Sequence, residues 1–336
     1  MPKKSPTSSG RFAGVFACAL LVVFAAAPAF ADPLPSWNDT GPKQDIIAFV
    51  EKVVTPGSAD YVDPAARIAT FDNDGTLWVE QPVYTNIAFA IDRTKELVPQ
   101  HPDWATTPPY AFAVAGNLDA ILRGDDNSYT LLTGVPFAGL TVAGYLDLST
   151  AWLATARHPR FDRPYTELAY QPMLELLTYL RANGFKTFIV SGGGVEFMRV
   201  FTDSLYGIPP EQVLGAAVVT EFKMAADGKP EVVRTATAFF DDNGPDKAVG
   251  IEATIGRRPI FAFGNSDGDL QMLQWTAAGE GARFMGLVHH TDAVREYAYD
   301  RDSLVGRLAE ALDAAVANGW TVVSMKDDWA RIFPAE

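Results

Sequence analysis

Cysteine is almost absent from this sequence. A single cysteine, Cys18, occurs in 336 residues, which excludes an internal disulfide and leaves stability to the burial of a hydrophobic core. The material for a core is present, because 48% of the residues are hydrophobic, and the length suggests one large domain or two. Internal repeats and low-complexity tracts are missing as well, which argues against a repeat architecture.

Basic residues are also in short supply. The chain has 27 Lys and Arg against 41 Asp and Glu, giving a formal net charge of −14. Such an acidic protein is a poor partner for nucleic acid or for anionic lipid. A small phosphoester remains compatible with it, because a local site can be positive in a negative protein.

Residues 1–31 have the pattern of a cleavable export signal. A basic start precedes an apolar run over 12–27, and Ala29-Phe30-Ala31 forms a small-x-small cleavage site. We expect cleavage after Ala31 and an exported protein, periplasmic or secreted. An uncleaved membrane anchor is the alternative, although the run is short for a spanning helix and is broken by Pro28. The basic residues of this segment are Lys3, Lys4 and Arg11.

The octapeptide Phe-Asp-Asn-Asp-Gly-Thr-Leu-Trp at 71–78 is the most informative stretch. It follows an apolar, partly β-branched run at 66–70 that predicts a buried strand, so Asp72 falls at a strand's carboxyl end. Ligands gather at that edge of open α/β sheets. A carboxylate there can attack phosphorus, and Asp74 can protonate the leaving oxygen and then activate water. The alternative is an ordinary Asx turn after a strand.

This octapeptide resembles the first motif, Asp-x-Asp-x-Thr, of the haloacid dehalogenase superfamily. The resemblance implies a doubly wound α/β core and, for most members, Mg²⁺-dependent phosphohydrolase activity. It also implies three further motifs, and the chain has candidates for all of them in the expected order.

The second candidate is Ser191-Gly192-Gly193-Gly194, which follows a predicted strand at 185–190 and precedes helical spacing. A strand, a glycine-rich turn and a helix start can cradle phosphate through backbone N–H groups and a hydroxyl. A turn without a ligand is the alternative. Ser191 and Gly192 match the second motif, and the sequence through Phe197 and 206–213 is similar to the phosphoserine phosphatase branch.

Lys247 is the candidate for the third motif. It lies in the first turn of a helix predicted from Gly244-Pro245, which is electrostatically unfavourable for a cation unless an anion faces it. Clustered aspartates and a phosphoryl group are such anions. An exposed lysine is the alternative.

The fourth candidate is Gly264-Asn265-Ser266-Asp267-Gly268-Asp269, after a predicted strand at 259–263. Oxygen side chains at this density suit Mg²⁺. The family pattern has an acidic residue where this chain has Asn265. We therefore expect weaker metal binding, which an aspartate at 265 should strengthen, and leave open whether Asn265 or Asp267 joins Asp269, Asp72 and the Asp74 carbonyl as ligands.

Three helices, predicted at 84–97, 110–122 and 142–157, separate the first two motifs. Their position matches the helical cap that the family inserts over its active site. The predicted organisation is therefore a catalytic core of residues 32–78 and 171–336 with a cap of residues 79–170. Basic residues of the cap are candidates for substrate contact or, more often, a solvated face: Arg93, Lys95, Arg123, Arg157, His158, Arg160 and Arg163.

Together these motifs predict a Mg²⁺-dependent phosphatase acting on a small phosphomonoester through an aspartyl-phosphate at Asp72. Ser191 and Lys247 are expected to hold the phosphoryl oxygens. Phosphotransfer, metal-free dehalogenation and a non-catalytic phosphate- or metal-binding role are the alternatives.

Overall fold

The computed structural model describes residues 1–5, 32–124 and 126–334. Residues Pro33–Glu336 form one compact unit. Most of the predicted export signal, including its cleavage site, lies outside the described residues. None of the described helices has the length and apolar character needed to cross a bilayer.

A seven-stranded sheet forms the centre of this unit, in the order β4-β3-β2-β1-β5-β6-β7. All neighbouring strands run parallel except β3 and β4, which are antiparallel. The predicted α/β class is confirmed. Because β2, β1 and β5 are neighbours, the motifs at their carboxyl ends meet at one sheet edge. The strands are β1 Ile68–Phe71, β2 Lys186–Gly194, β3 Val213–Met224, β4 Pro230–Phe240, β5 Phe261–Gly264, β6 Phe284–His289 and β7 Thr321–Ser324.

Helices cover both faces of the sheet, because alternate residues of its buried strands point to opposite sides. Phe261 and Phe263 of β5 lie in an apolar cluster with Phe49 of α1, so the segment that precedes β1 packs on one face of the sheet. Ala262, between them, lies in a second cluster with Leu273 of α11. Core helices are α1 Gly41–Val54, α7 Gln171–Ala182, α8 Val195–Arg199, α9 Thr202–Tyr206, α10 Pro245–Ile255, α11 Leu270–Ala277, α12 Glu310–Asn318 and α13 Met325–Asp328. The helix predicted from Leu304 begins only at Glu310.

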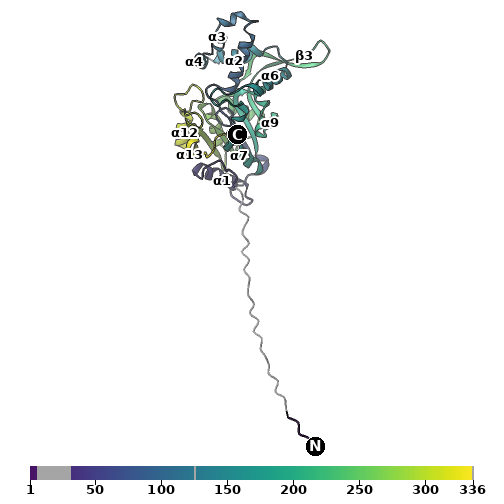
Figure 1. The fold of residues 1–336 in the computed structure, drawn as a ribbon, viewed down its shortest axis with the longest axis vertical. Helices are drawn as coiled ribbons and strands as arrows, with labels where there is room; N and C mark the ends of the chain where they lie inside the picture. The colour runs from purple at the N-terminus through teal and green to yellow at the C-terminus, as the bar shows by residue number, and fades with distance from the viewer. Residues whose placement is uncertain (6–31, 125, 335–336) are drawn as a thin grey trace. The chain divides into compact units, whose positions relative to one another are not determined.

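Residues 79–170 are mainly helical and have an apolar cluster of their own, which includes Ile87, Trp104 and Leu132. Several of these helices lie at the top of Figure 1. The helix predicted at 110–122 is divided at Gly116, which has a left-handed backbone, and a further helix at 126–134 was not predicted. The helices are α2 Thr85–Leu97, α3 Tyr110–Ala115, α4 Leu118–Leu122, α5 Asp126–Gly134 and α6 Val142–Thr155.

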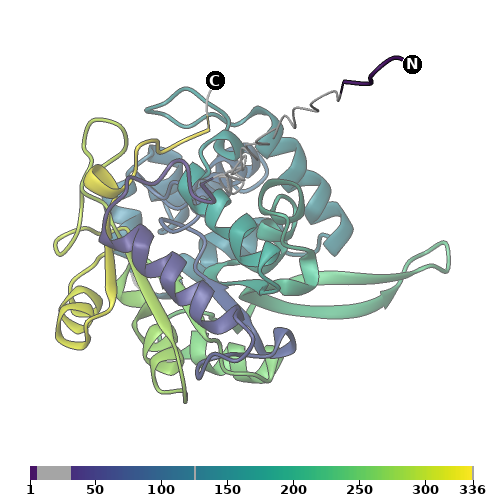
Figure 2. The same cartoon turned by 90° about the horizontal axis from the view of Figure 1, so that it is seen from below.

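β3 and β4 form a long hairpin that projects from the unit (Figures 1 and 2). The sequence predicted a strand at 213–220 followed by an irregular hairpin, and both strands extend further than expected. Where β4 leaves the sheet it meets the helical segment, since the backbone N–H of Arg234 donates to Leu140 O. The hairpin and the helices together therefore bound the space above the sheet edge.

Candidate active site

Lys247 joins the first, third and fourth motifs. Its Nζ lies 2.8 Å from Asp72 Oδ1 and 2.6 Å from Asp269 Oδ1, and only 2% of the lysine is exposed. Burial alone lowers the pKa of Lys247, but Asp269 and Asp72 outweigh it and raise the pKa above its ordinary value. The cation in the first turn of α10 thus has the anionic partners that its position requires.

The loop after β1 positions the two aspartates of the first motif. The Asp72 N–H donates to Phe263 O of β5, and the N–H groups of Thr76 and Leu77 donate to Asn73 O, closing a tight turn. Trp78 Nε1 donates to Asp74 Oδ1 at 2.8 Å. These contacts hold both carboxylates at the carboxyl end of β1, where the sequence placed them.

Burial raises the pKa of both carboxyl groups. The pKa of Asp72 rises to about 7, with repulsion from Asp269 adding to burial and Lys247 opposing it. The pKa of Asp74 rises to about 6, again chiefly through burial, while its hydrogen bond with Trp78 works in the opposite direction. Asp74 therefore exchanges its proton close to neutral pH, as a general acid and base must.

The glycine-rich motif is a bulged strand end, not the separate turn that the sequence suggested. Ser191 and Gly194 belong to β2, and the pairing with β3 shifts register between them. A Cβ on Gly193 would lie 3.3 Å from Asp74 Oδ2 and 3.5 Å from Ser191 Oγ. The missing side chain leaves open space between these two groups.

The fourth motif divides into residues that face the site and one that does not. Asp269 is fully buried, and its Oδ2 accepts from the N–H groups of Asn265 and Ser266. Asp267 Oδ1 instead accepts from the N–H groups of Ala309 and Ala311 at the start of α12. Its carboxylate caps a helix, which favours Asn265 over Asp267 as the further metal ligand, and the assignment of Asp267 to the metal stays a prediction.

Asn265 is held on both sides of its amide. Thr76 Oγ1 donates to Asn265 Oδ1 at 2.9 Å, and Asn265 Nδ2 donates to Glu80 Oε1 at 2.7 Å. Glu80 is buried, and burial raises its pKa well above the ordinary value. The sequence analysis missed Glu80, although it stands only two residues beyond the octapeptide.

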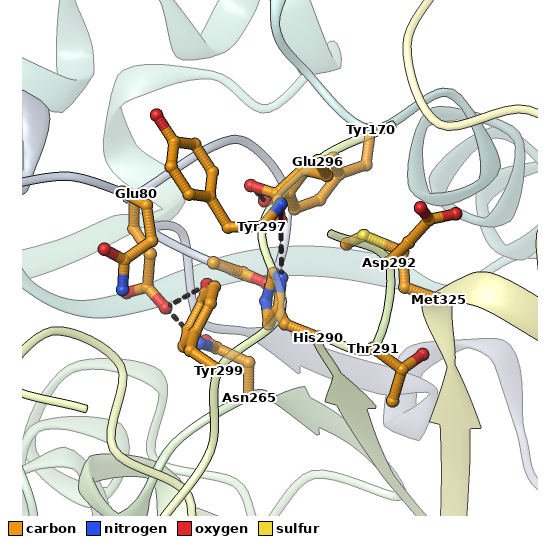
Figure 3. Close-up of polar contacts among 12 residues, drawn as sticks. Glu80, Tyr170, Asn265, His290, Thr291, Asp292, Glu296, Tyr297, Tyr299 and Met325 are labelled. Atoms are coloured by element: carbon orange, nitrogen blue, oxygen red, sulfur yellow. Dashed lines mark hydrogen bonds and ion pairs between the residues drawn. The ribbon is translucent and has the colours of Figure 1, made fainter. Parts of the chain in front are cut away.

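Figure 3 shows Glu80 at one end of a buried polar network. Tyr299 OH donates to Glu80 Oε1 at 2.7 Å, and the Tyr299 ring stacks on His290 at a centroid distance of 4.4 Å. His290 Nε2 lies 2.8 Å from Gly75 O, and Nδ1 lies 3.2 Å from Glu296 Oε2. In the sequence, His290 follows an apolar run predicted as a strand at 284–288, where we expect hydrogen bonding more than metal ligation. The structure confirms the hydrogen bonds, which connect the residue after β6 to the loop after β1.

A cavity of about 320 Å³ opens above these groups and includes Asp72, Asp74, Ser191, Gly192 and Lys247 in its wall. Its outer wall comes from the helical segment and the hairpin, through Tyr129, Tyr145 and Arg234 among others. Arg234 forms a close ion pair with Glu196 and stacks over the Tyr145 ring at 3.9 Å. The basic residues proposed in 79–170 are not in this wall, so the arginine of the cavity comes from β4.

The donor chemistry of the site fits a hard divalent cation. Asp72 and Asp269 offer carboxylate oxygens and Asn265 an amide oxygen. The Lys247 ammonium contacts the carboxylates of Asp72 and Asp269, while Asp74 and Glu80 are buried in the wall of the same cavity. Within the part of the chain that the structure describes, no three His, Cys, Asp or Glu side chains form a metal cluster by themselves. The oxygen donors named above differ from such a cluster because one of them, Asn265, is an amide and not a carboxylate.

Comparison with known families agrees with this geometry. Residues 69–274 match the haloacid dehalogenase-like hydrolases, a span that contains all four motifs. The chain belongs to this family. It is therefore a member of a hydrolase family, and the sheet edge just described is where the motifs of the family converge. A search of curated proteins gave no match.

The solved structures that this chain matches are distant from it in sequence. A functionally unknown protein from Anaerococcus prevotii is 14% identical, with a TM-score of 0.51 over 84% of this chain and 91% of that chain. A Bordetella pertussis protein of unknown function is 16% identical, with a TM-score of 0.50 over 77% of this chain and 98% of that chain. A phosphoserine phosphohydrolase-like protein from Francisella tularensis is 18% identical, with a TM-score of 0.37 over 66% and 87%.

Proposed function

We propose that this protein is a Mg²⁺-dependent phosphatase that hydrolyses a small phosphomonoester through an aspartyl-phosphate at Asp72. The observation that carries the proposal is the buried contact of Lys247 with Asp72 and Asp269, beside Asp74 and Ser191 in one cavity. A nucleophile, a proton carrier, a phosphate cradle and a cation are the parts that phosphoryl transfer through a carboxylate needs.

In the first step an oxygen of Asp72 attacks phosphorus while the bond from phosphorus to the leaving oxygen breaks. Asp74 gives its proton to that oxygen, so the alcohol leaves neutral. In the second step Asp74 takes a proton from water as the water oxygen attacks phosphorus. The bond to Asp72 breaks, the carboxylate returns and inorganic phosphate is released.

Ser191 and Lys247 stabilise the charge on the phosphoryl oxygens. Ser191 Oγ already accepts from the Gly193 N–H at 3.2 Å, which orients the hydroxyl and leaves its hydrogen to donate. We assign Mg²⁺ to Asp72, the backbone carbonyl of Asp74, and Asn265 with Asp269, where it would neutralise phosphoryl charge. Lys247 keeps Asp72 oriented and close to the phosphoryl group.

The proposal extends to the cap and to the export signal. Residues 79–170 act as the cap, because Tyr129 and Tyr145 close the cavity above the reacting groups. We further propose that the protein acts outside the cytoplasm, on the basis of the sequence pattern of residues 1–31. The 320 Å³ cavity suits a small leaving group.

The test is phosphate release by the purified protein from a panel of phosphomonoesters, in Mg²⁺ and in EDTA, with Asp72→Asn as the control. We expect hydrolysis only in Mg²⁺, and a loss of more than about a hundredfold in the variant, which lacks the nucleophile at nearly constant volume. Activity that persists in EDTA together with halide release from haloacids would instead support the dehalogenase alternative. Transfer of phosphate to an added alcohol would identify a phosphotransferase, and binding without turnover a non-catalytic member.

A further inference from the structure

Glu80 stands against the one residue of the site that departs from the family pattern. Asn265 replaces an acidic residue, and its Nδ2 donates to Glu80 Oε1 at 2.7 Å (Figure 3). The two residues are 185 positions apart in sequence, so their contact exists only in the folded chain. The fold therefore places the carboxyl group of Glu80 next to position 265, where the family pattern has an acidic residue.

The backbone makes room for this contact. Gly75 has φ 76° and Gly306 has φ 64°, both in the left-handed region. A Cβ on Gly75 would collide with Asn265 Nδ2 and Glu80 Oε1, and a Cβ on Gly306 would collide with Glu80 Oε1. Two glycines in a conformation unfavourable for other residues thus enclose the Glu80 carboxylate.

The surroundings of Glu80 supply hydrogen bonds but little positive charge. Its described partners are the Asn265 amide and the Tyr299 hydroxyl, and the charged groups that act on it include Asp74, Asp72 and Glu296, all acidic. Tyr299 is fixed by stacking on His290, which is itself bonded to Gly75 O. The carboxylate is accordingly rigid, only 2% exposed, and directed at the amide.

We propose that Glu80 is a positioning residue that holds the Asn265 amide for Mg²⁺ through this hydrogen bond, and so raises the affinity of the site for the metal. This inference rests on the metal assignment in the proposed function. By accepting from Nδ2, Glu80 fixes the amide so that Oδ1, which has a second lone pair beyond its bond with Thr76, is available to a cation. Partners of this kind typically change metal affinity by about 10- to 100-fold.

The contact reverses the expectation drawn from sequence for residue 265. An aspartate there would remove the Nδ2 donor and set a second carboxyl group about one hydrogen-bond length from that of Glu80. Like charges at that distance repel. Asn265→Asp should therefore weaken Mg²⁺ binding while Glu80 is present, and should be tolerated only when residue 80 becomes an amide.

The experiment measures Mg²⁺ binding to the purified, substrate-free protein by isothermal titration calorimetry. We expect Glu80→Gln and Asn265→Asp each to raise the Kd by about 10-fold or more. The double variant exchanges carboxylate and amide, so its Kd should return to within about threefold of wild type. Tyr299→Phe, which removes a hydrogen bond from Glu80 but keeps its charge, is the matched control and should stay within about threefold. Circular dichroism confirms folding of each variant.

Two results would overturn the inference: an unchanged Kd in Glu80→Gln, or a tighter Kd in Asn265→Asp with Glu80 in place. A double variant whose Kd for Mg²⁺ stays as high as that of the single variants would also contradict the inference. Because binding is measured without substrate, the outcome is separate from catalysis. A protein that releases no phosphate but follows the expected Kd pattern refutes the proposed function alone. One that hydrolyses phosphoesters in Mg²⁺ but shows no change of Kd in Glu80→Gln refutes this inference alone.

Discussion

Lys247 Nζ lies 2.8 Å from Asp72 Oδ1 across 175 residues of sequence, and the same ammonium contacts Asp269. A buried lysine between two aspartates can balance them only in part, because Asp74 and Glu80 are buried nearby. The site therefore has an excess of negative charge when no metal is bound. That imbalance makes the stability of the metal-free protein depend on pH.

In EDTA, we expect the free energy of unfolding to fall as the pH rises from about 4 to about 7. The pKa values of Asp72 and Asp74 are raised from 3.8 to about 7 and about 6, so the folded protein holds more protons than the unfolded chain across this window. The slope should be on the order of 1 kcal/mol per pH unit for each carboxylate. Urea denaturation at several pH values measures it, with Asp72→Asn as a control of smaller slope. A free energy that rises over this window would contradict the raised pKa values.

Asp74→Asn should slow phosphorylation of Asp72 to a degree that depends on the leaving group. An aryl phosphate with an activated leaving group needs little protonation, whereas an alkyl phosphate needs a full proton transfer. We expect the single-turnover rate to fall by roughly 10²- to 10⁴-fold for the alkyl ester and by clearly less for the aryl ester. Equal losses for both substrates would remove Asp74 from the acid role.

Gly193→Ala should lower activity without a comparable loss of stability. Its new methyl group would stand 3.3 Å from Asp74 Oδ2 and 3.5 Å from Ser191 Oγ, in the space assigned to the phosphoryl group. We expect kcat/KM to fall by roughly 10- to 100-fold, since small displacements of reacting groups have effects of that size. Gly194→Ala, whose Cβ would meet the Asn86 side chain at 3.5 Å, is the matched control and should lose less. Comparable kinetics for the two variants would contradict the proposed phosphate position.

Asp267→Ala should affect stability and leave the metal requirement unchanged. Its Oδ1 accepts from the N–H groups of Ala309 and Ala311, and loss of a helix cap costs about 1 kcal/mol. Thermal unfolding measures the stability lost with the cap of helix α12. The Mg²⁺ concentration for half-maximal activity shows whether metal binding has changed. Asp267→Asn, which keeps an oxygen acceptor, should retain more stability. A steep rise in the Mg²⁺ requirement of the alanine variant would make Asp267 a ligand after all.

Much of the fold was predictable from sequence because the buried parallel strands are short apolar runs that end at glycine or at polar turn residues. The strands around Thr70, Val190 and Phe263 were placed to within a few residues, and the motifs at their ends follow from that placement. The start of α12 was misplaced because the apolar spacing from Leu304 continues into a loop that is fixed by Asp267. Helix propensity and apolar periodicity cannot predict where a helix begins when its N-terminal cap comes from a distant part of the chain.

Local patterns at strand ends are enough to predict the family, the order of its motifs and the types of residue at the site. How those residues pair depends on the folded chain. It gave Asp267 to a helix, Arg234 to the cavity wall and Glu80 to Asn265. The direction of a polar side chain is set by its hydrogen-bond and ion-pair partners. The partner lies 42 residues away in the chain for Asp267, 38 for Arg234 and 185 for Glu80, so no local pattern contains it.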